Sequence, residues 1–415
     1  MIKKLIVPAF LLFSLFSFAQ EGTSSPYSFY GIGDVKFKGT VDNKSMGGLT
    51  VFSDSIHINF QNPASYPNLK LTSFSIAGTY LTTKFKTSDQ QENARRTGID
   101  YLAVAVPAGK LGFGFGLIPY SSVGYKIKTI TETPPAEERR YSGSGGLNKA
   151  FLGFGYAITP KLNVGLDVSY NFGKIVTNSL RFVDEVQFGS RERNESNITG
   201  SIFTAGFTYK TKFKKLPFFA SLTFSPQSNL KSTNDRKIAT LQYTLSGAEL
   251  VVDESTVDVA NTTIKLPSKL AFGAGIGQSK KWMLGAEITM QQSSNFGNRF
   301  NDIDNIDFKD AIKYNIGGYF IPNYNSYSSY FSRVVYRGGL RYENTGLVIN
   351  GKSINDMGVT FGLGLPLPGA FSNINIGAEF GKRGTTNAGL VQENYLNLSI
   401  GLSLNDKWFV KRLYN

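Results

Sequence analysis

Residues 161–173 read KLNVGLDVSYNFG, and the pattern in this stretch decides how the chain folds. Every second residue is apolar: Leu162, Val164, Leu166, Val168, Tyr170 and Phe172. The residues between them are Asn163, Gly165, Asp167, Ser169, Asn171 and Gly173. Because successive side chains of a β-strand point to opposite faces, one face is apolar and the other is polar or bare. Such alternation over roughly ten residues, with the apolar face ending in aromatic rings, is typical of a strand that crosses a membrane.

The same alternation recurs along the chain from about residue 70 onward. Clear examples are residues 111–117, 282–291, 357–365 and 396–404. After Gln20, no window approaches the roughly 18 apolar residues of a transmembrane helix. The Gly-x-Gly runs lie inside predicted strands and not at a strand-to-helix turn, so they do not indicate a dinucleotide site. The repetition predicts a transmembrane β-barrel.

The lengths of the connections predict the number of strands and their direction. Short connections occupy residues 107–110, 159–161, 212–216, 277–281, 322–330 and 367–371. Longer polar connections occupy residues 85–97, 125–148, 177–198, 229–262, 293–308, 347–355 and 383–393. Outer-membrane barrels place short turns in the periplasm and long loops outside. The alternation of six short and seven long connections therefore predicts 14 antiparallel strands, with both ends of the barrel in the periplasm.

The N-terminus has the features of a cleaved secretion signal. Lys3 and Lys4 precede an apolar run over residues 5–16, and Ser17 and Ala19 are small residues at the two positions that signal peptidase inspects. We expect residues 1–19 to be removed, so that the mature chain begins at Gln20. Export combined with membrane-spanning strands places the protein in the outer membrane.

Composition argues against catalysis and against several kinds of binding site. The chain has no cysteine and a single histidine, His57, so disulfides, thiolate metal sites, His-cluster zinc sites and His-based triads are not expected. No Gly-x-Ser-x-Gly motif is present either. We predict no enzyme activity, no cofactor and no metal.

The formal net charge is +14. The basic residues are scattered through predicted loops and turns, which does not indicate a nucleic-acid partner. Attraction to outer-membrane lipid and lipopolysaccharide headgroups is one explanation, and general solvation of the surface is the other.

A segment without clean alternation, residues 20–69, precedes the barrel of residues 70–415. It contains Met46-Gly47-Gly48, then Ser53-Asp54-Ser55, then Asn62-Pro63-Ala64. This order of motifs resembles the FadL-like outer-membrane barrels, a group that includes PorV-type and PorQ-type barrels of the type IX secretion system. The resemblance implies that the segment is a hatch folded into the lumen of a 14-stranded barrel. The prediction is thus an all-β fold, with a hatch motif at Gly47, Gly48, Asn62, Pro63 and Ala64.

The predicted lumen face combines glycine with charge. Glycine recurs at inward positions, either because the hatch backbone packs there or because glycine relieves sheet curvature. Charges of both signs also point inward by parity, which indicates a network that holds the hatch and not a single-sign ion filter. Its predicted members are Asp167, Lys265, Lys269, Glu287, Arg337, Arg341 and Glu379.

Two functions follow as hypotheses. The resemblance implies passive transport of small hydrophobic molecules, which enter from outside and leave sideways at a strand kink beside the hatch. Pro119 is a candidate for that kink because it lacks an N–H, although it can equally mark the end of a strand. The alternative is an accessory or gating subunit that binds a large secretion translocon or its substrates, as PorV-type relatives do.

Overall fold

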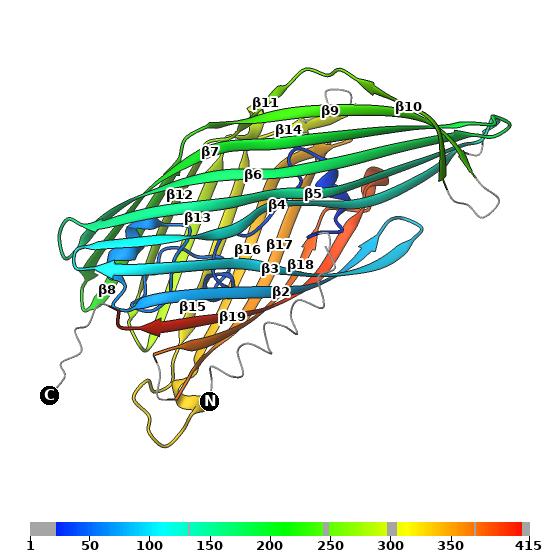
Figure 1. The fold of residues 1–415 in the computed structure, drawn as a ribbon. Coiled ribbons are helices and arrows are strands. Elements are labelled where there is room, and N and C mark those ends of the chain that lie inside the picture. Colours follow the sequence, from blue (N-terminus) through cyan, green and yellow to red (C-terminus); the bar gives the residue numbers. More distant parts are fainter. Residues whose placement is uncertain (1–21, 132, 244–248, 297–304, 369–370, 409–415) are drawn as a thin grey trace, which may run out of the picture.

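The computed structural model describes residues 22–131, 133–243, 249–296, 305–368 and 371–408. Residues 1–21, which contain the predicted signal peptide, lie outside the described part. The chain forms a closed antiparallel β-barrel around an N-terminal segment, residues 22–71 (Figure 1). Within the described residues, no helix is long and apolar enough to cross a membrane.

The barrel has 14 strands, as predicted. Six of them are single elements: β2 (Thr72–Lys86), β3 (Gln91–Ala108), β4 (Leu111–Thr131), β5 (Glu137–Ala157), β6 (Leu162–Val183) and β7 (Gly189–Phe213). The seventh barrel strand consists of β8 (Leu216–Ser225) and β9 (Ser228–Tyr243), and the eighth of β10 (Glu249–Val257), β11 (Thr262–Leu266) and β12 (Lys269–Gln278). The others are β13 (Trp282–Gln291), β14 (Ile306–Phe308) with β15 (Ala311–Phe320), β16 (Val335–Ile349), β17 (Lys352–Pro366), β18 (Asn373–Arg383) and β19 (Gln392–Asp406). The barrel closes where β19 pairs with β2, from Asp406↔Thr72 to Gln392↔Lys86.

Alternation in the sequence becomes alternation of burial. In β6, Leu166, Val168, Tyr170 and Phe172 are exposed on the outside of the barrel, whereas Asp167, Ser169 and Asn171 are buried in the lumen. Lipid covers such an outer face in the membrane, and the lumen residues pack against the hatch. The core of the molecule is therefore the lumen, where Phe60, Tyr66 and Leu69 of the hatch meet Tyr101 and Phe151 of the wall.

The strands differ greatly in length, and the difference gives the molecule a tall wall on one side. β13 and β18, each a single element, have 10 and 11 residues, about what a tilted strand needs to cross a membrane. β5, β6 and β7 have 21, 22 and 25 residues. Their short turns are level with the other short turns, so the extra length extends outward, roughly 35–50 Å along the strands at the usual rise per residue (Figure 1).

The outer part of this wall lies in water. Several ion pairs lie on this part of the wall, including Lys128–Glu138 at 3.2 Å, Arg236–Glu192 at 3.2 Å and Arg191–Glu254 at 3.1 Å. At the far end of the wall, β10 pairs with β9 from Glu249↔Tyr243 to Val257↔Arg236. Apolar side chains nevertheless remain exposed near the tip: Val186, Phe188, Ile238, Leu250, Val251 and Val252. Beyond the membrane, the wall is thus an open sheet and not part of a closed cylinder.

Candidate functional site

The hatch crosses the lumen from the outer half to the periplasmic end. It contains η1 (Pro26–Phe29), β1 (Asp34–Val35), α2 (Val41–Lys44) and η2 (Pro63–Asn68). Gly47 and Gly48 turn the chain just after the short helix, with positive φ angles of 72° and 89°, which suit glycine. Asn62 caps η2, because its Oδ1 accepts a hydrogen bond from the backbone N–H of Ala64 at 3.1 Å. Its amide also donates to the carbonyl of Phe207 in the wall at 3.2 Å.

Lumen glycines let the hatch lie directly against the strands. A Cβ placed on Gly112 would lie 2.4 Å from the carbonyl carbon of Tyr66, and one on Gly165 would lie 2.4 Å from the backbone nitrogen of Ala64. On the opposite wall, a Cβ on Gly339 would lie 2.3 Å from the backbone nitrogen of Gly47. Any side chain there would displace the hatch backbone. Close packing of the hatch thus accounts for these glycines.

Charged lumen residues connect the hatch to several strands. Arg341 of β16 pairs with Asp356 at 3.0 Å and Glu379 at 2.8 Å, and Lys44 of the hatch lies 3.9 Å from Glu379. Glu287 accepts a hydrogen bond from the backbone N–H of Thr50 at 2.9 Å. The structure therefore brings Arg341 and Glu379 together in one cluster and places Glu287 directly on the hatch.

The other predicted network residues occupy separate positions. Asp167 pairs with Lys149 of the neighbouring strand at 3.0 Å, and Arg337 donates to Asn375 at 2.9 Å. Lys269 faces the lumen cavity described below. Lys265 lies apart from the network: it is exposed, between Ile264 and Leu266, which are buried in the lumen. The strand is interrupted between β11 and β12, and this interruption separates Lys265 from Lys269. The prediction assumed one continuous strand in which both lysines face the same side.

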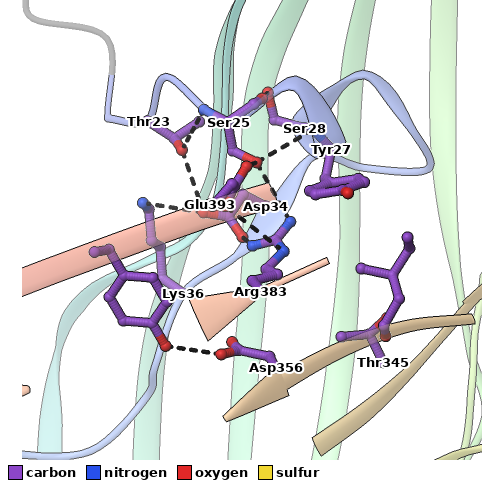
Figure 2. Close-up of polar contacts among 12 residues, drawn as sticks. Thr23, Ser25, Tyr27, Ser28, Asp34, Lys36, Thr345, Asp356, Arg383 and Glu393 are labelled. Carbon is purple, nitrogen blue, oxygen red and sulfur yellow. Dashed lines mark hydrogen bonds and ion pairs between the residues drawn. The ribbon is translucent and has the colours of Figure 1, made fainter. Parts of the chain in front are cut away.

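Sequence reasoning missed the polar cluster that holds the first turn of the hatch. Arg383 of β18 reaches Asp34 at 2.8 Å and lies 3.9 Å from Glu393 of β19, which in turn accepts a hydrogen bond from Ser25. Figure 2 shows Arg383, Asp34 and Glu393 gathered beneath Ser25 and Tyr27. Arg383 shares the inward parity of Glu379 four residues earlier, and that signal could have identified it.

A cavity of about 540 Å³ lies between the hatch and the outer half of the barrel. Charged side chains from the hatch and from the wall line it, including Lys38, Lys149, Lys269, Lys313, Glu287 and Glu343. Burial, and then the positive charges of Lys269, Lys149 and Lys313, hold the pKa of Lys38 well below its usual value. The cavity can accommodate a small amphipathic molecule, because its lining combines these charged side chains with apolar ones such as Phe37, Phe60 and Ile99. Among the described residues, no group of three or more histidine and acidic side chains is arranged to hold a metal ion.

The barrel wall opens sideways next to this cavity. β3 and β4 pair from Ala108↔Leu111 to Leu102↔Leu117 and then separate. Above that point β1 of the hatch pairs with β4, at Asp34↔Ser122 and Val35↔Ser121. Figure 1 shows the outer end of the β2–β3 hairpin standing apart from β4 and β5.

The edges of this opening combine irregular backbone with exposed apolar residues. Pro119 lines the cavity, and the register between β4 and β5 shifts between Pro119 and Ser121. Ile99 and Val35, which also line the cavity, are 66% and 54% exposed. The hatch thus forms part of the wall at the place where two barrel strands part.

Comparison with known families decides where the chain belongs. The model of one family, BamG, matches residues 1–415, the whole chain. The chain belongs to the BamG family. No curated protein matches it.

Solved structures with the same fold are outer-membrane channels. The Ralstonia pickettii toluene transporter TbuX superposes on this BamG-family chain with a TM-score of 0.63 at 13% identity, covering 89% of this chain and 99% of that one. The monoaromatic hydrocarbon channel CymD gives 0.59 at 11% identity, with 92% and 99% covered. The Pseudomonas putida toluene transporter TodX gives 0.57 at 16% identity, with 90% and 98% covered. At such identities the likeness shows the fold alone, that of the barrel which these channels share.

Proposed function

We propose that this BamG-family barrel is an accessory subunit that binds another protein, and that its outer wall is the binding surface. The observation that carries the proposal is the length of β5, β6 and β7, which exceeds what the membrane requires by about ten residues or more. A strand that extends into water gains nothing from lipid, so its extra length calls for another use.

The tip of the wall has the chemistry of a contact surface. Leu250, Val251 and Val252 of β10 are exposed beside acidic residues, and the backbone of an edge strand can pair with a strand from another chain. The occupant we propose is an extracellular segment of a large outer-membrane translocon or of its substrates. The resemblance to PorV-type barrels supports this choice of partner.

The lumen supports the same proposal. Hatch backbone lies against glycines on two sides of the barrel, and the lining of the remaining cavity includes several charged side chains. A hydrocarbon in this cavity would take charged side chains out of water, which has a cost in free energy. A barrel whose lumen is filled in this way is better suited to present a binding surface on its outer wall than to conduct molecules through its lumen.

The test is a native purification with and without the tip. A variant in which a short Gly-Ser turn replaces residues 236–257 removes the β9–β10 hairpin. A control variant shortens the β2–β3 hairpin at residues 87–90, which changes an outer loop and leaves the wall intact. We expect the wild type and the control to retain a stoichiometric large partner and the tip variant to lose it while remaining folded. A lone barrel in all three preparations would contradict the proposal.

The lateral opening favours a second function, passage of small hydrophobic or amphipathic molecules. Its edges, Ile99 and Val35, are apolar and connect the cavity with the outside of the barrel. Mass spectrometry of the purified barrel tests this function. Co-purified lipid or fatty acid that is lost on substitution Ile99→Lys, with no protein partner, would favour passage over the accessory role.

A further inference from the structure

The periplasmic face of the barrel carries charge of one sign. The six turns on this side are residues 109–110, 158–161, 214–215, 279–281, 321–334 and 367–372. They contain seven cationic residues and no aspartate or glutamate: Lys110, Lys161, Lys214, Lys215, Lys280, Lys281 and Arg333. Nearby acidic residues are Asp54 of the hatch and Asp406 at the end of β19, which is followed by Lys407. The field over this face is therefore strongly positive.

One of these turns differs from the rest in length and content. The connection between β15 and β16 has 14 residues, 321–334, whereas the others have two to six. It presents aromatic rings to water: Tyr327 is fully exposed, Phe331 is 73% exposed and Tyr324 is 45% exposed. In Figure 1 this loop, coloured yellow to gold, projects beyond the neighbouring strand ends.

The loop is held in one shape by its own contacts. Ile321 and Val334 are buried at its two ends, and the backbone N–H of Asn323 donates to the carbonyl of Ser332 at 2.8 Å. The N–H of Ser329 donates to Oγ of Ser326 at 3.2 Å, close to Tyr327 in the chain. An ordered loop that keeps large rings in water is costly for the isolated protein and favours a contact that covers them.

The aromatic loop and the basic turns form one surface. Lys280 Nζ lies 4.5 Å from the centre of the Tyr324 ring, and the N–H of Ile321 donates to the carbonyl of Lys281 at 2.6 Å. Tyrosine and arginine are the residues that most often dominate binding at protein interfaces, and surrounding charges select the partner and speed its approach.

We infer that the periplasmic face binds an acidic periplasmic protein or domain, with Tyr327 and Phe331 inserted into it and the turn lysines facing its carboxylates. This partner is distinct from the one proposed for the outer wall and lies on the opposite side of the membrane. Phospholipid headgroups are the rival occupant. Rings that serve the membrane interface sit at strand ends, as Phe213 and Phe320 do, whereas Tyr327 lies in the middle of a long loop.

Site-specific photocrosslinking in living cells tests the inference. The photoreactive residue p-benzoylphenylalanine replaces Tyr327 in the full-length protein, and a lipid-facing control carries it at Phe115. We expect a discrete protein adduct at position 327 and none at position 115. The double variant Lys280→Glu/Lys281→Glu should lower the adduct severalfold, whereas Lys126→Glu/Lys128→Glu, which makes the same charge change on the outer part of β4, should leave it unchanged.

Each other outcome overturns the inference. Adducts with lipid alone would assign the loop to the membrane interface, and the absence of any adduct would leave the rings without a partner. A protein adduct that is indifferent to the Lys280 and Lys281 reversals would remove the charge complementarity. The adduct should survive removal of residues 236–257, so failure of this inference can be distinguished from failure of the outer-wall proposal.

Discussion

Leu166 and Asp167 are adjacent in β6 and lie in opposite surroundings. Leu166 is 47% exposed on the outer face, in the part of the strand that crosses the membrane, whereas Asp167 is buried beside Lys149. The two faces therefore respond to different forces: transfer into lipid on one side, and packing and charge pairing on the other.

Leu166→Arg should lower the free energy of unfolding by roughly 2–4 kcal/mol, because it places a guanidinium near the middle of the bilayer. Leu111→Arg is the matched control, since Leu111 faces outward at the periplasmic end of β4, where the cost falls to about 0–1 kcal/mol. Urea unfolding of the barrel in lipid vesicles measures both. Equal costs at the two positions would contradict the depth assigned to Leu166.

Gly338 and Gly339 provide a second pair with opposite surroundings. A Cβ on Gly339 would collide with the backbone of Met46 and Gly47, whereas one on Gly338 would meet only the carbonyl oxygen of Thr360, at 3.9 Å. Gly339→Val should therefore cost about 1–3 kcal/mol or more and expose the hatch to added protease. Gly338→Val should leave the proteolysis pattern unchanged. Equal protection of the hatch in both variants would mean that it does not rest on β16.

At the scale of elements, the hatch has a titratable contact in the turn of residues 53–57. His57 Nδ1 lies 2.6 Å from the carboxylate of Asp54. Partial burial opposes ionisation of Asp54, but the charge of His57 and hydrogen bonds from His57, Ser55 and Ile56 outweigh it and lower the pKa of Asp54 to about 2. Burial likewise opposes protonation of His57, yet the charges of Asp54 and Asp42 and the hydrogen bond raise the pKa of His57.

This pair predicts a pH window for the stability of the hatch. The depressed pKa of Asp54 contributes stability above pH 4, and this is lost as pH falls toward 2. The raised pKa of His57 contributes stability that is complete below about pH 6.5 and is lost as pH rises through the folded value. Because Asp54 is half exposed, the gain should stay below about 1 kcal/mol. Proteolysis of the hatch should differ most between wild type and Asp54→Asn from pH 4 to 6.5; a difference independent of pH would contradict the pairing.

The predicted short connections show where reasoning from the sequence succeeds at this scale. The turn at residues 214–215 lies inside the predicted range of 212–216. Its consecutive lysines interrupt the alternation of apolar and polar residues, so the sequence shows where the strand ends. The connection predicted at residues 322–330 extends over 321–334. Its aromatic residues have the composition of a strand, so composition alone does not reveal that they form an ordered loop.

For the whole molecule, closure through β19 and β2 has a simple consequence. Continuous pairing of β19 with β2 leaves no free strand edge at the seam between the two ends of the barrel, from which unfolding could start. The mature protein should therefore migrate differently on a denaturing gel before and after boiling, as sealed barrels do. Identical mobility would argue against closure.

The sequence alone determined the barrel, its 14 strands and the side of most strand residues, because alternation with a period of two is a local property that lipid and lumen impose on every strand. Lys265, beside the break between β11 and β12, is an exception. The sequence also indicated that a hatch would lie against glycines and charged residues on the lumen face. The tertiary structure decided which charges meet, and it joined Arg383, Asp34 and Glu393, which are distant in the sequence. It alone revealed the separation of β3 from β4 and the open wall beyond the membrane. These features depend on where neighbouring strands stop pairing with each other. The alternation of apolar and polar residues along one strand does not show where that pairing ends.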